Sequence, residues 1–140
     1  MAEPNDPARE AWALLWEVMQ ANKPRFMALS QELGLSPVQL HTLRIIEPGV
    51  EVPMSSLAGK LFCDNSNVTG IVDRLEARGL IARRPAEHDR RVKTLVVTDK
   101  GIATRAEVER SMSVPPPPLA GLSDADAASL RDILQRALDV

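Results

Sequence analysis

Cysteine, aromatic residues and long apolar runs are all scarce in this sequence of 140 residues. The single cysteine, Cys63, excludes a disulfide within one chain, and an aromatic content of 3% leaves aliphatic side chains and alanine to fill the core. No run approaches the roughly 18 apolar residues that are needed to cross a bilayer. Residues 1–6 are acidic and polar, unlike a signal peptide. These absences favour a single cytoplasmic domain without a membrane contact.

Side chains that often carry enzyme chemistry occur in no recognisable arrangement. His41 and His88 lack the spacing to each other or to Cys63 that a zinc site needs. No combination of serine, histidine and acid suggests a nucleophile, and no glycine-rich loop suggests a phosphate site. We therefore expect no metal, no cofactor and no enzymatic activity.

Positive charge is concentrated in one segment, although the whole chain has a net charge of −2. Residues 74–93 contain seven basic and three acidic residues, which gives the segment a net charge of +4. A basic stripe on an acidic body is typical of a surface that binds nucleic acid. Charge alone fits an ordinary solvated face equally well. The sequence pattern around the stripe is therefore needed to distinguish a nucleic-acid surface from a solvated face.

The first third of the chain has the spacing of a helix with one interruption. Apolar residues at helical intervals predict a helix over residues 8–20. Pro24 should kink or break this helix, because proline lacks an N–H and clashes one turn back. The pattern resumes over 26–33, where Gly34 is expected as the helix end.

The next helices have clear start and end signals. Ser36, followed by proline and then by glutamine three residues on, predicts a helix start with a capping box. Two shorter helices are expected over about 54–61 and 65–78. Asp64 should cap the second of these, and Gly79 should end it.

The pattern changes from helical to β after residue 79. Residues 80–84 and 92–97 predict two strands joined by a polar loop, and the second strand is rich in β-branched residues. Further helices are expected over 98–112 and 123–140, with a stiff polyproline spacer at 115–118 between them. Two helices that meet at a tight turn and precede a hairpin predict a mainly α fold with a small β-hairpin wing, a winged helix-turn-helix.

The predicted helix over 65–78 carries short polar side chains opposite its apolar face. Asparagine can pair bidentately with adenine, arginine with guanine, and serine or threonine with several base edges. Gly70 lowers helix stability by about 0.5–1 kcal/mol relative to alanine, and close approach of a duplex is a reason to keep it. The same face is also typical of an ordinary amphipathic helix. Candidate DNA contacts on this helix are Ser66, Asn67, Thr69, Gly70, Asp73 and Arg74.

Three motifs in register make the interpretation more specific. The stretch CDNSNVTGIVDRLEARGLI at 63–81 resembles the recognition helix, and the end of that helix, in the MarR (multiple antibiotic resistance regulator) family. The triplet DRR at 89–91 resembles the wing motif Asp-x-Arg of that family, and TDKG at 98–101 resembles its entry into the following helix. The flanking helices occur in the order of the family, so the resemblance covers nearly the whole chain.

The resemblance implies a homodimeric regulator, a ligand-responsive repressor, that binds double-stranded DNA at an inverted repeat. Residues 8–34 and 102–140 would form dimerisation helices, and 36–101 the DNA-binding lobe. Arg91 would reach the minor groove, and Asp89 would orient it through a salt bridge. The spacing of Asp89 and Arg91 agrees with this salt bridge, because residues two positions apart on a strand lie on the same face. Phosphate contacts are expected from Arg83, Arg84, Arg90 and Lys93.

The resemblance also implies a small anionic or phenolic effector, which in this family often binds between the first helices and the DNA-binding lobe. Trp12, Trp16, His41 and Arg44 are the candidate residues, and the alternative is a dimer core of tryptophans with a solvated arginine. Cys63 invites an oxidant-sensing hypothesis, but its place between the two DNA-binding helices favours core packing. A second class of function, a winged-helix module whose basic face binds an acidic partner protein, stays open.

Overall fold

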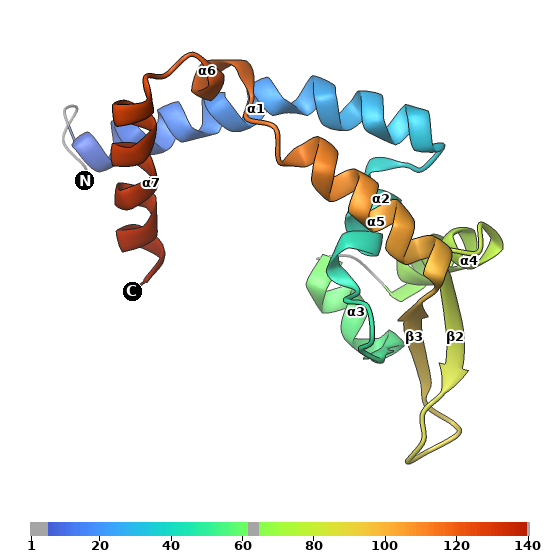
Figure 1. The fold of residues 1–140 in the computed structure, drawn as a ribbon. Helices are drawn as coiled ribbons and strands as arrows, with labels where there is room; N and C mark the ends of the chain where they lie inside the picture. The colour runs from blue at the N-terminus through green and yellow to red at the C-terminus, as the bar shows by residue number, and fades with distance from the viewer. Residues whose placement is uncertain (1–5, 62–64, 140) are drawn as a thin grey trace. The chain divides into compact units, whose positions relative to one another are not determined.

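The structure, a computed structural model, describes residues 6–61 and 65–139, with only the backbone at 65 and 66. It is mainly helical with one small antiparallel sheet, which confirms the predicted fold class (Figure 1). Cys63 and Asp64, for which core packing and helix capping are predicted, lie outside the described residues. The elements are α1 (Pro7–Leu33), α2 (Pro37–Ile45), β1 (Val52–Pro53), α3 (Met54–Leu61), α4 (Asn65–Ala77), β2 (Ile81–Pro85), β3 (Lys93–Val97), α5 (Asp99–Met112), α6 (Pro117–Ala120) and α7 (Asp124–Leu138).

Helix α1 runs without interruption through Pro24, so the predicted break is wrong. Proline removes one backbone donor and crowds the carbonyl one turn back, at a local cost of about 3 kcal/mol. It also disfavours helical geometry at the preceding residue without forbidding it. The next side chain, Arg25, donates to the carbonyl oxygens of Val114 and Pro115, which ties this part of the helix to the segment before α6.

The signals that start and end the short helices act as predicted. The Ser36 hydroxyl accepts a hydrogen bond from the Gln39 N–H at 3.2 Å, and the Gln39 side chain accepts one from the Ser36 N–H at 3.0 Å. Gly79 ends α4 at a φ of +71°, a left-handed conformation that glycine adopts without strain. The N–H groups of Gly79 and Leu80 then donate to the carbonyls of Glu76 and Leu75, the two hydrogen bonds of a Schellman motif.

The four prolines at 115–118 do not form one extended spacer. Pro116 is extended, with φ −65° and ψ 157°, but Pro117 is the first residue of the short helix α6. The first turn of a helix needs no N–H donors from its own residues, so proline fits there with its φ already set. Pro116 therefore keeps the extended conformation that the sequence predicts, but the run as a whole does not.

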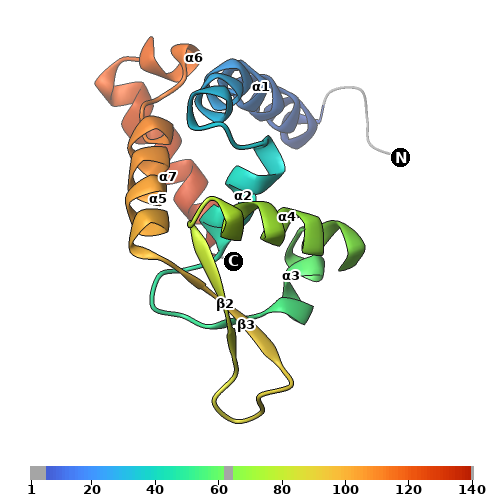
Figure 2. The same cartoon turned by 90° about the vertical axis from the view of Figure 1, so that its right-hand side faces the viewer.

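The sheet confirms the predicted hairpin and adds a short strand. Strands β2 and β3 pair antiparallel from Ile81 opposite Val97 to Pro85 opposite Lys93. Strand β1, which the sequence did not predict, has two residues and pairs on the other side of β3. Both views show the hairpin extending away from α3 and α4 (Figures 1 and 2).

The hydrophobic core belongs to one of two compact units. Residues 27–112 form one unit, and residues 1–26 with 113–140 form the other. Among the described residues, every buried apolar residue lies between Leu29 and Val108, and none is buried among 6–26 and 113–139. No helix within the described residues is long and apolar enough to cross a membrane. The unit 27–112 contains the end of α1, all of α2–α5 and the sheet, and we call it the lobe.

Gly101, in the first turn of α5, lies against the chain where it leaves α4. A Cβ atom at this position would be 2.0 Å from the carbonyl oxygen of Leu80 and 2.7 Å from Cγ1 of Val97. Thr98 caps the same turn, because its hydroxyl accepts the Gly101 N–H at 3.1 Å. The end of α4 and the start of α5 can therefore approach this closely only with glycine at 101.

We expect Gly101→Ala to lower the free energy of unfolding by about 1–3 kcal/mol, the usual cost of adding atoms to a filled core. Gly70→Ala is the matched control, since nothing lies within 4 Å of the Cβ it would add. That change should raise the free energy of unfolding by about 0.5–1 kcal/mol, because alanine is the better helix former. Urea denaturation followed by circular dichroism measures both, and a Gly101→Ala protein as stable as the wild type would contradict the packing argument.

Candidate nucleic-acid interface

Helix α4 is held in the lobe by one apolar face. Val68, Ile71, Val72 and Leu75 are all buried on that face, as their helical spacing predicts. The polar residues predicted to face outward are exposed wherever the structure describes their side chains, and the side chain of Ser66 is outside that description. These exposed residues are Asn67, Thr69, Gly70, Asp73 and Arg74.

The outer surface of α4 has two edges. Thr69, Asp73 and Glu76 follow one another at intervals of four and three residues, so they share one edge of the helix. Asn67, Gly70 and Arg74, at intervals of three and four, share the other edge. The space over Gly70 is open, with no atom within 4 Å of a Cβ built there, so nothing inside the described chain requires a glycine. An open polar row, formed by Asn67, Gly70 and Arg74, therefore remains along the second edge.

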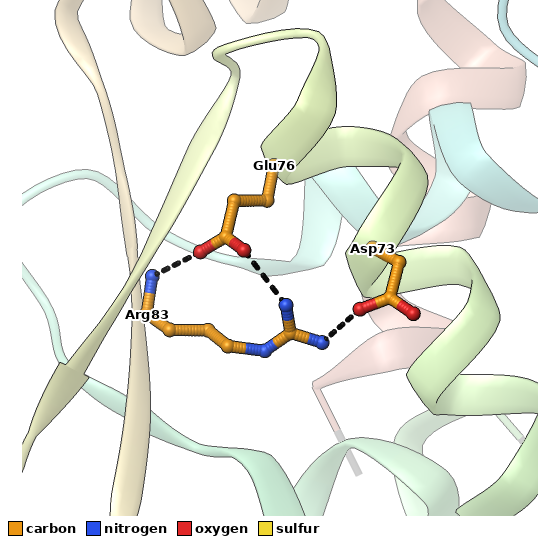
Figure 3. Close-up of polar contacts among 3 residues, drawn as sticks. All are labelled: Asp73, Glu76 and Arg83. Atoms are coloured by element: carbon orange, nitrogen blue, oxygen red, sulfur yellow. Dashed lines mark hydrogen bonds and ion pairs between the residues drawn. The ribbon is translucent and has the colours of Figure 1, made fainter.

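Arg83 on β2 binds the first edge of α4 with both its side chain and its backbone (Figure 3). Its Nη2 donates to Asp73 at 2.5 Å, and its Nη1 donates to Glu76 at 2.8 Å. The Arg83 backbone N–H also donates to Glu76, at 3.0 Å. Mainly through the hydrogen bond to Asp73, these carboxylates raise the pKa of Arg83 above its ordinary value, so the guanidinium stays charged. We call these three residues the α4–β2 clamp.

The sequence predicts Asp73 and Arg83 as separate DNA contacts and does not predict a role for Glu76. In the structure the two residues bind each other. A signal for this was present, since Glu76 follows Asp73 by three residues and strand β2 begins four residues after α4 ends. Helical and strand periodicity give the face of each residue, but not the partner that it finds across a turn.

Asp89 and Arg91 make the contact that the sequence predicts, but in a turn and not on a strand. One carboxylate oxygen of Asp89 accepts from the Arg91 backbone N–H at 3.0 Å and from the Arg91 Nε at 3.3 Å. The Asp89 carbonyl also accepts the N–H of Val92 at 3.0 Å. Aspartate often bonds to the backbone two residues on in this way, which tightens a turn. The Arg91 side chain is 92% exposed, so its charge faces solvent at the hairpin tip.

The basic stripe divides into cations used inside the chain and cations that face solvent. Arg83 is in the clamp, and Arg78, which was not a predicted site residue, donates at 2.7 Å to the carbonyl oxygens of both Leu33 and Gly34. Four other cations are exposed and form no ion pair within the part of the chain that the structure describes. These are Arg74, Arg84, Arg90 and Lys93.

The four candidate effector residues are divided between the two units. Trp12 and Trp16 are exposed on α1, with ring centroids 6.3 Å apart, and lie in the unit with residues 113–140. His41 and Arg44 lie on α2 in the lobe, where Arg44 pairs with Glu109 at 2.9 Å. An effector site shared by these four residues stays a prediction.

Comparison with known proteins places this lobe in a family. The MarR family model matches residues 35–93, from the start of α2 to the first residue of β3. The HTH-type transcriptional repressor MdtR of Bacillus subtilis (strain 168) is 33% identical over 87 residues, which cover 62% of this chain. The match covers 56% of MdtR, so this chain spans little more than half of that relative.

Two solved structures extend the likeness to the flanking helices. The transcriptional regulator Tm0710 from Thermotoga maritima is 26% identical with a TM-score of 0.75, and the match covers 94% of this chain and 93% of that one. MepR in its DNA complex from S. aureus has a TM-score of 0.65 at 18% identity, covering 89% of this chain and 98% of that one, and shares the fold. Family model, sequence similarity and fold agree: residues 35–93 match the MarR family model, and the chain is similar in sequence and fold to transcriptional regulators.

Proposed function

We propose that this protein is a transcriptional repressor that binds double-stranded DNA sequence-specifically as a homodimer. The observation that carries the proposal is the presence, on one lobe, of an open polar row on α4 and an exposed arginine at the tip of the wing. The name of MdtR as a repressor and the crystallisation of MepR with DNA support the proposal. In it, α4 enters the major groove and the wing follows the DNA backbone to the minor groove.

The residues on the open edge of α4 have the chemistry for reading bases. Asn67 and Arg74 can make bidentate hydrogen bonds to adenine and guanine, and Gly70 between them lets the duplex approach the helix backbone. Arg91 would insert into a narrow minor groove, where the negative potential is enhanced. The other exposed cations of the wing, Arg84, Arg90 and Lys93, would contact phosphates, which fix the register of the protein on the duplex.

We expect the wild-type protein to bind random duplex with an affinity that falls steeply with salt. The logarithm of the binding constant should fall with a slope of about −0.9 per phosphate contact, since each contact releases condensed counterions. Selection from a random pool should recover an inverted repeat with half-sites about 10 bp apart, the spacing that a two-fold symmetric dimer presents to successive major grooves.

Fluorescence anisotropy over a salt series measures the slope, and sequencing of the selected pool gives the site. Recovery of asymmetric or single-stranded sequences alone would contradict the symmetric operator. Salt-insensitive binding to duplex, together with tight binding to an acidic polypeptide, would instead support the protein-interaction module.

Apolar surface that one chain leaves uncovered supports the proposed dimer. Leu14 on α1 is 62% exposed and Ile133 on α7 is 54% exposed. Both line a cavity of about 290 Å³ between α1, α6 and α7, whose lining is apolar throughout. Exposed apolar patches of this kind mark protein interfaces in soluble proteins. A second copy of the same unit, related by a two-fold axis, would present the same apolar face in return.

We expect light scattering at micromolar concentration to give about twice the chain mass of 15.3 kDa. Ile133→Asp should shift the protein towards monomer, because a dimer would bury the new charge without a partner. Val50→Asp is the matched control, since Val50 is 46% exposed and lies in the lobe. A monomeric wild type, or equal loss of dimer in both variants, would contradict this interface.

The proposal gives Asp89 a role that opposes simple electrostatics. Removing an acid from a DNA-binding loop should strengthen binding if long-range charge alone mattered. Asp89, however, holds the backbone and the Nε of Arg91, and arginine has about 2 kcal/mol of side-chain entropy to lose on binding. The repulsion that its removal would relieve is screened over about 8 Å at physiological salt. Positioning of Arg91 should therefore outweigh the repulsion.

We expect Asp89→Ala to weaken binding to the selected operator while binding to random duplex stays equal or becomes slightly tighter. The double variant with Arg91→Ala should bind the operator little worse than Arg91→Ala alone, because the two residues act as one unit. A double-mutant cycle on one operator at fixed salt measures this. Additive losses, or tighter operator binding by Asp89→Ala, would mean that the aspartate does not serve the arginine.

A further inference from the structure

We propose that Arg83 is a positioning residue that fixes the wing against the recognition helix and makes no contact with DNA. This inference rests on the proposed function, and it revises the phosphate contact that the sequence predicts for this residue. It is carried by the α4–β2 clamp, in which Arg83 binds Asp73 and Glu76 within one chain (Figure 3).

The clamp fixes both the side chain and the backbone of Arg83. Glu76 accepts the Arg83 backbone N–H through one oxygen and the guanidinium through the other, while Asp73 accepts from the second guanidinium nitrogen. Two side chains one turn apart on α4 thus bind one residue of β2. With three bonds to one residue, rotation of β2 about α4 or sliding along it would break at least one bond of the clamp. A single ion pair would leave both motions open.

The charge of the clamp argues against a phosphate contact. It contains two carboxylates and one guanidinium, so its net charge is −1, and only 24% of the Arg83 side chain is exposed. A phosphate near Arg83 would also meet the exposed carboxylate of Asp73, 2.5 Å from the guanidinium. The cation that would attract DNA is therefore already neutralised by acids on the helix that lies beside it.

The position of β2 decides where Arg91 lies. Strand β2 pairs with β3 along its whole length, from Ile81 to Pro85, and the turn with Asp89 and Arg91 joins the two strands. Holding Arg83 near the middle of β2 therefore sets the direction of the whole hairpin relative to α4. The distance between the base-reading row of α4 and Arg91 is then a fixed property of the lobe.

A fixed distance between two reading elements affects specificity more than affinity. Random duplex is bound through phosphates, which repeat along the strand and tolerate a shifted wing. An operator is recognised only when base contacts in the major groove and the minor-groove arginine are in register together. Loss of the clamp should therefore lower the ratio of operator binding to random-duplex binding.

Arg84 provides a matched control for Arg83. It is the next residue on the same strand, so its side chain points to the opposite face, and it is exposed without an ion pair among the described residues. Arg83→Gln and Arg84→Gln remove the same charge from adjacent positions. A contact with phosphate and a positioning role predict different results for the two changes.

The experiment measures binding of wild type and both variants to the selected operator and to random duplex over a salt series. Arg84→Gln should reduce the magnitude of the salt slope by about 0.9. It should weaken binding to the operator and to random duplex by a similar factor. Arg83→Gln should leave the slope on random duplex at the wild-type value and lower the operator-to-random ratio by about tenfold or more, the loss of a groove contact. A slope reduced as in Arg84→Gln would overturn the positioning role.

An exact exchange tests the clamp directly. Arg83→Asp combined with Asp73→Arg keeps one guanidinium, two carboxylates and the total side-chain length, but puts an acid where a phosphate contact would need a base. The operator-to-random ratio should return to within about threefold of wild type, whereas Arg83→Asp alone should lower it by about tenfold or more. Failure of the exchange to restore the ratio, in a variant that circular dichroism shows to be folded, would overturn the inference.

The two proposals fail in different ways. If the wild type binds neither duplex in a salt-dependent manner, the proposed function fails before Arg83 is considered. If the wild type binds DNA and Arg83→Gln behaves as Arg84→Gln does, only the positioning role fails. If Arg83→Gln does not fold, the exchange variant decides the question alone.

Discussion

The lobe depends on the backbone junction where α4 ends, β2 begins and α5 starts. Backbone carbonyl groups in a segment between two elements need hydrogen-bond partners from elsewhere in the chain. Here the carbonyls of Arg78, Gly79 and Leu80 each accept a hydrogen bond from residues 98–100, at 2.5–3.1 Å. Gly101 lets the two chain segments come this close. The wing leaves the recognition helix at this junction. The position of every wing residue relative to α4 therefore depends on the geometry of the junction.

Burial separates a lobe that is complete in one chain from a unit that is not. The lobe fills its core with aliphatic side chains from α2–α5 and the sheet, as the low aromatic content requires. The unit formed by residues 6–26 and 113–139 buries none of its residues, although α1 and α7 both carry apolar faces. Apolar burial supplies most of the free energy of folding. Burial of these apolar faces against a partner would stabilise the helices of this unit, and the proposed dimer would supply that burial.

The sequence predicted those parts of the fold that local chemistry decides. The capping box at Ser36, the end of α4 at Gly79 and the apolar face of α4 each depend on residues within one or two turns. The failures lie where distant residues compete with a local preference. Helix α1 continues through Pro24, next to which Arg25 binds the distant carbonyls of Val114 and Pro115, and β1 is a strand through its pairing with β3. The α4–β2 clamp was not predicted because it joins residues of two elements. Periodicity gives the face on which a residue lies, but not its partner across a turn.

The two uses of arginine in this lobe follow from different energetic demands. A partly exposed ion pair contributes about 0–1 kcal/mol to stability, so the clamp around Arg83 adds little to the folded state. In the proposed function, the clamp would instead lower the entropy cost of binding DNA. A wing that is already held in place loses less conformational freedom when it binds. Arg91, at 92% exposure, keeps its charge available, and among the described residues its side chain is held by Asp89. In the proposed function, exposed cations would thus govern affinity, while cations paired inside the chain would govern the geometry on which specificity depends.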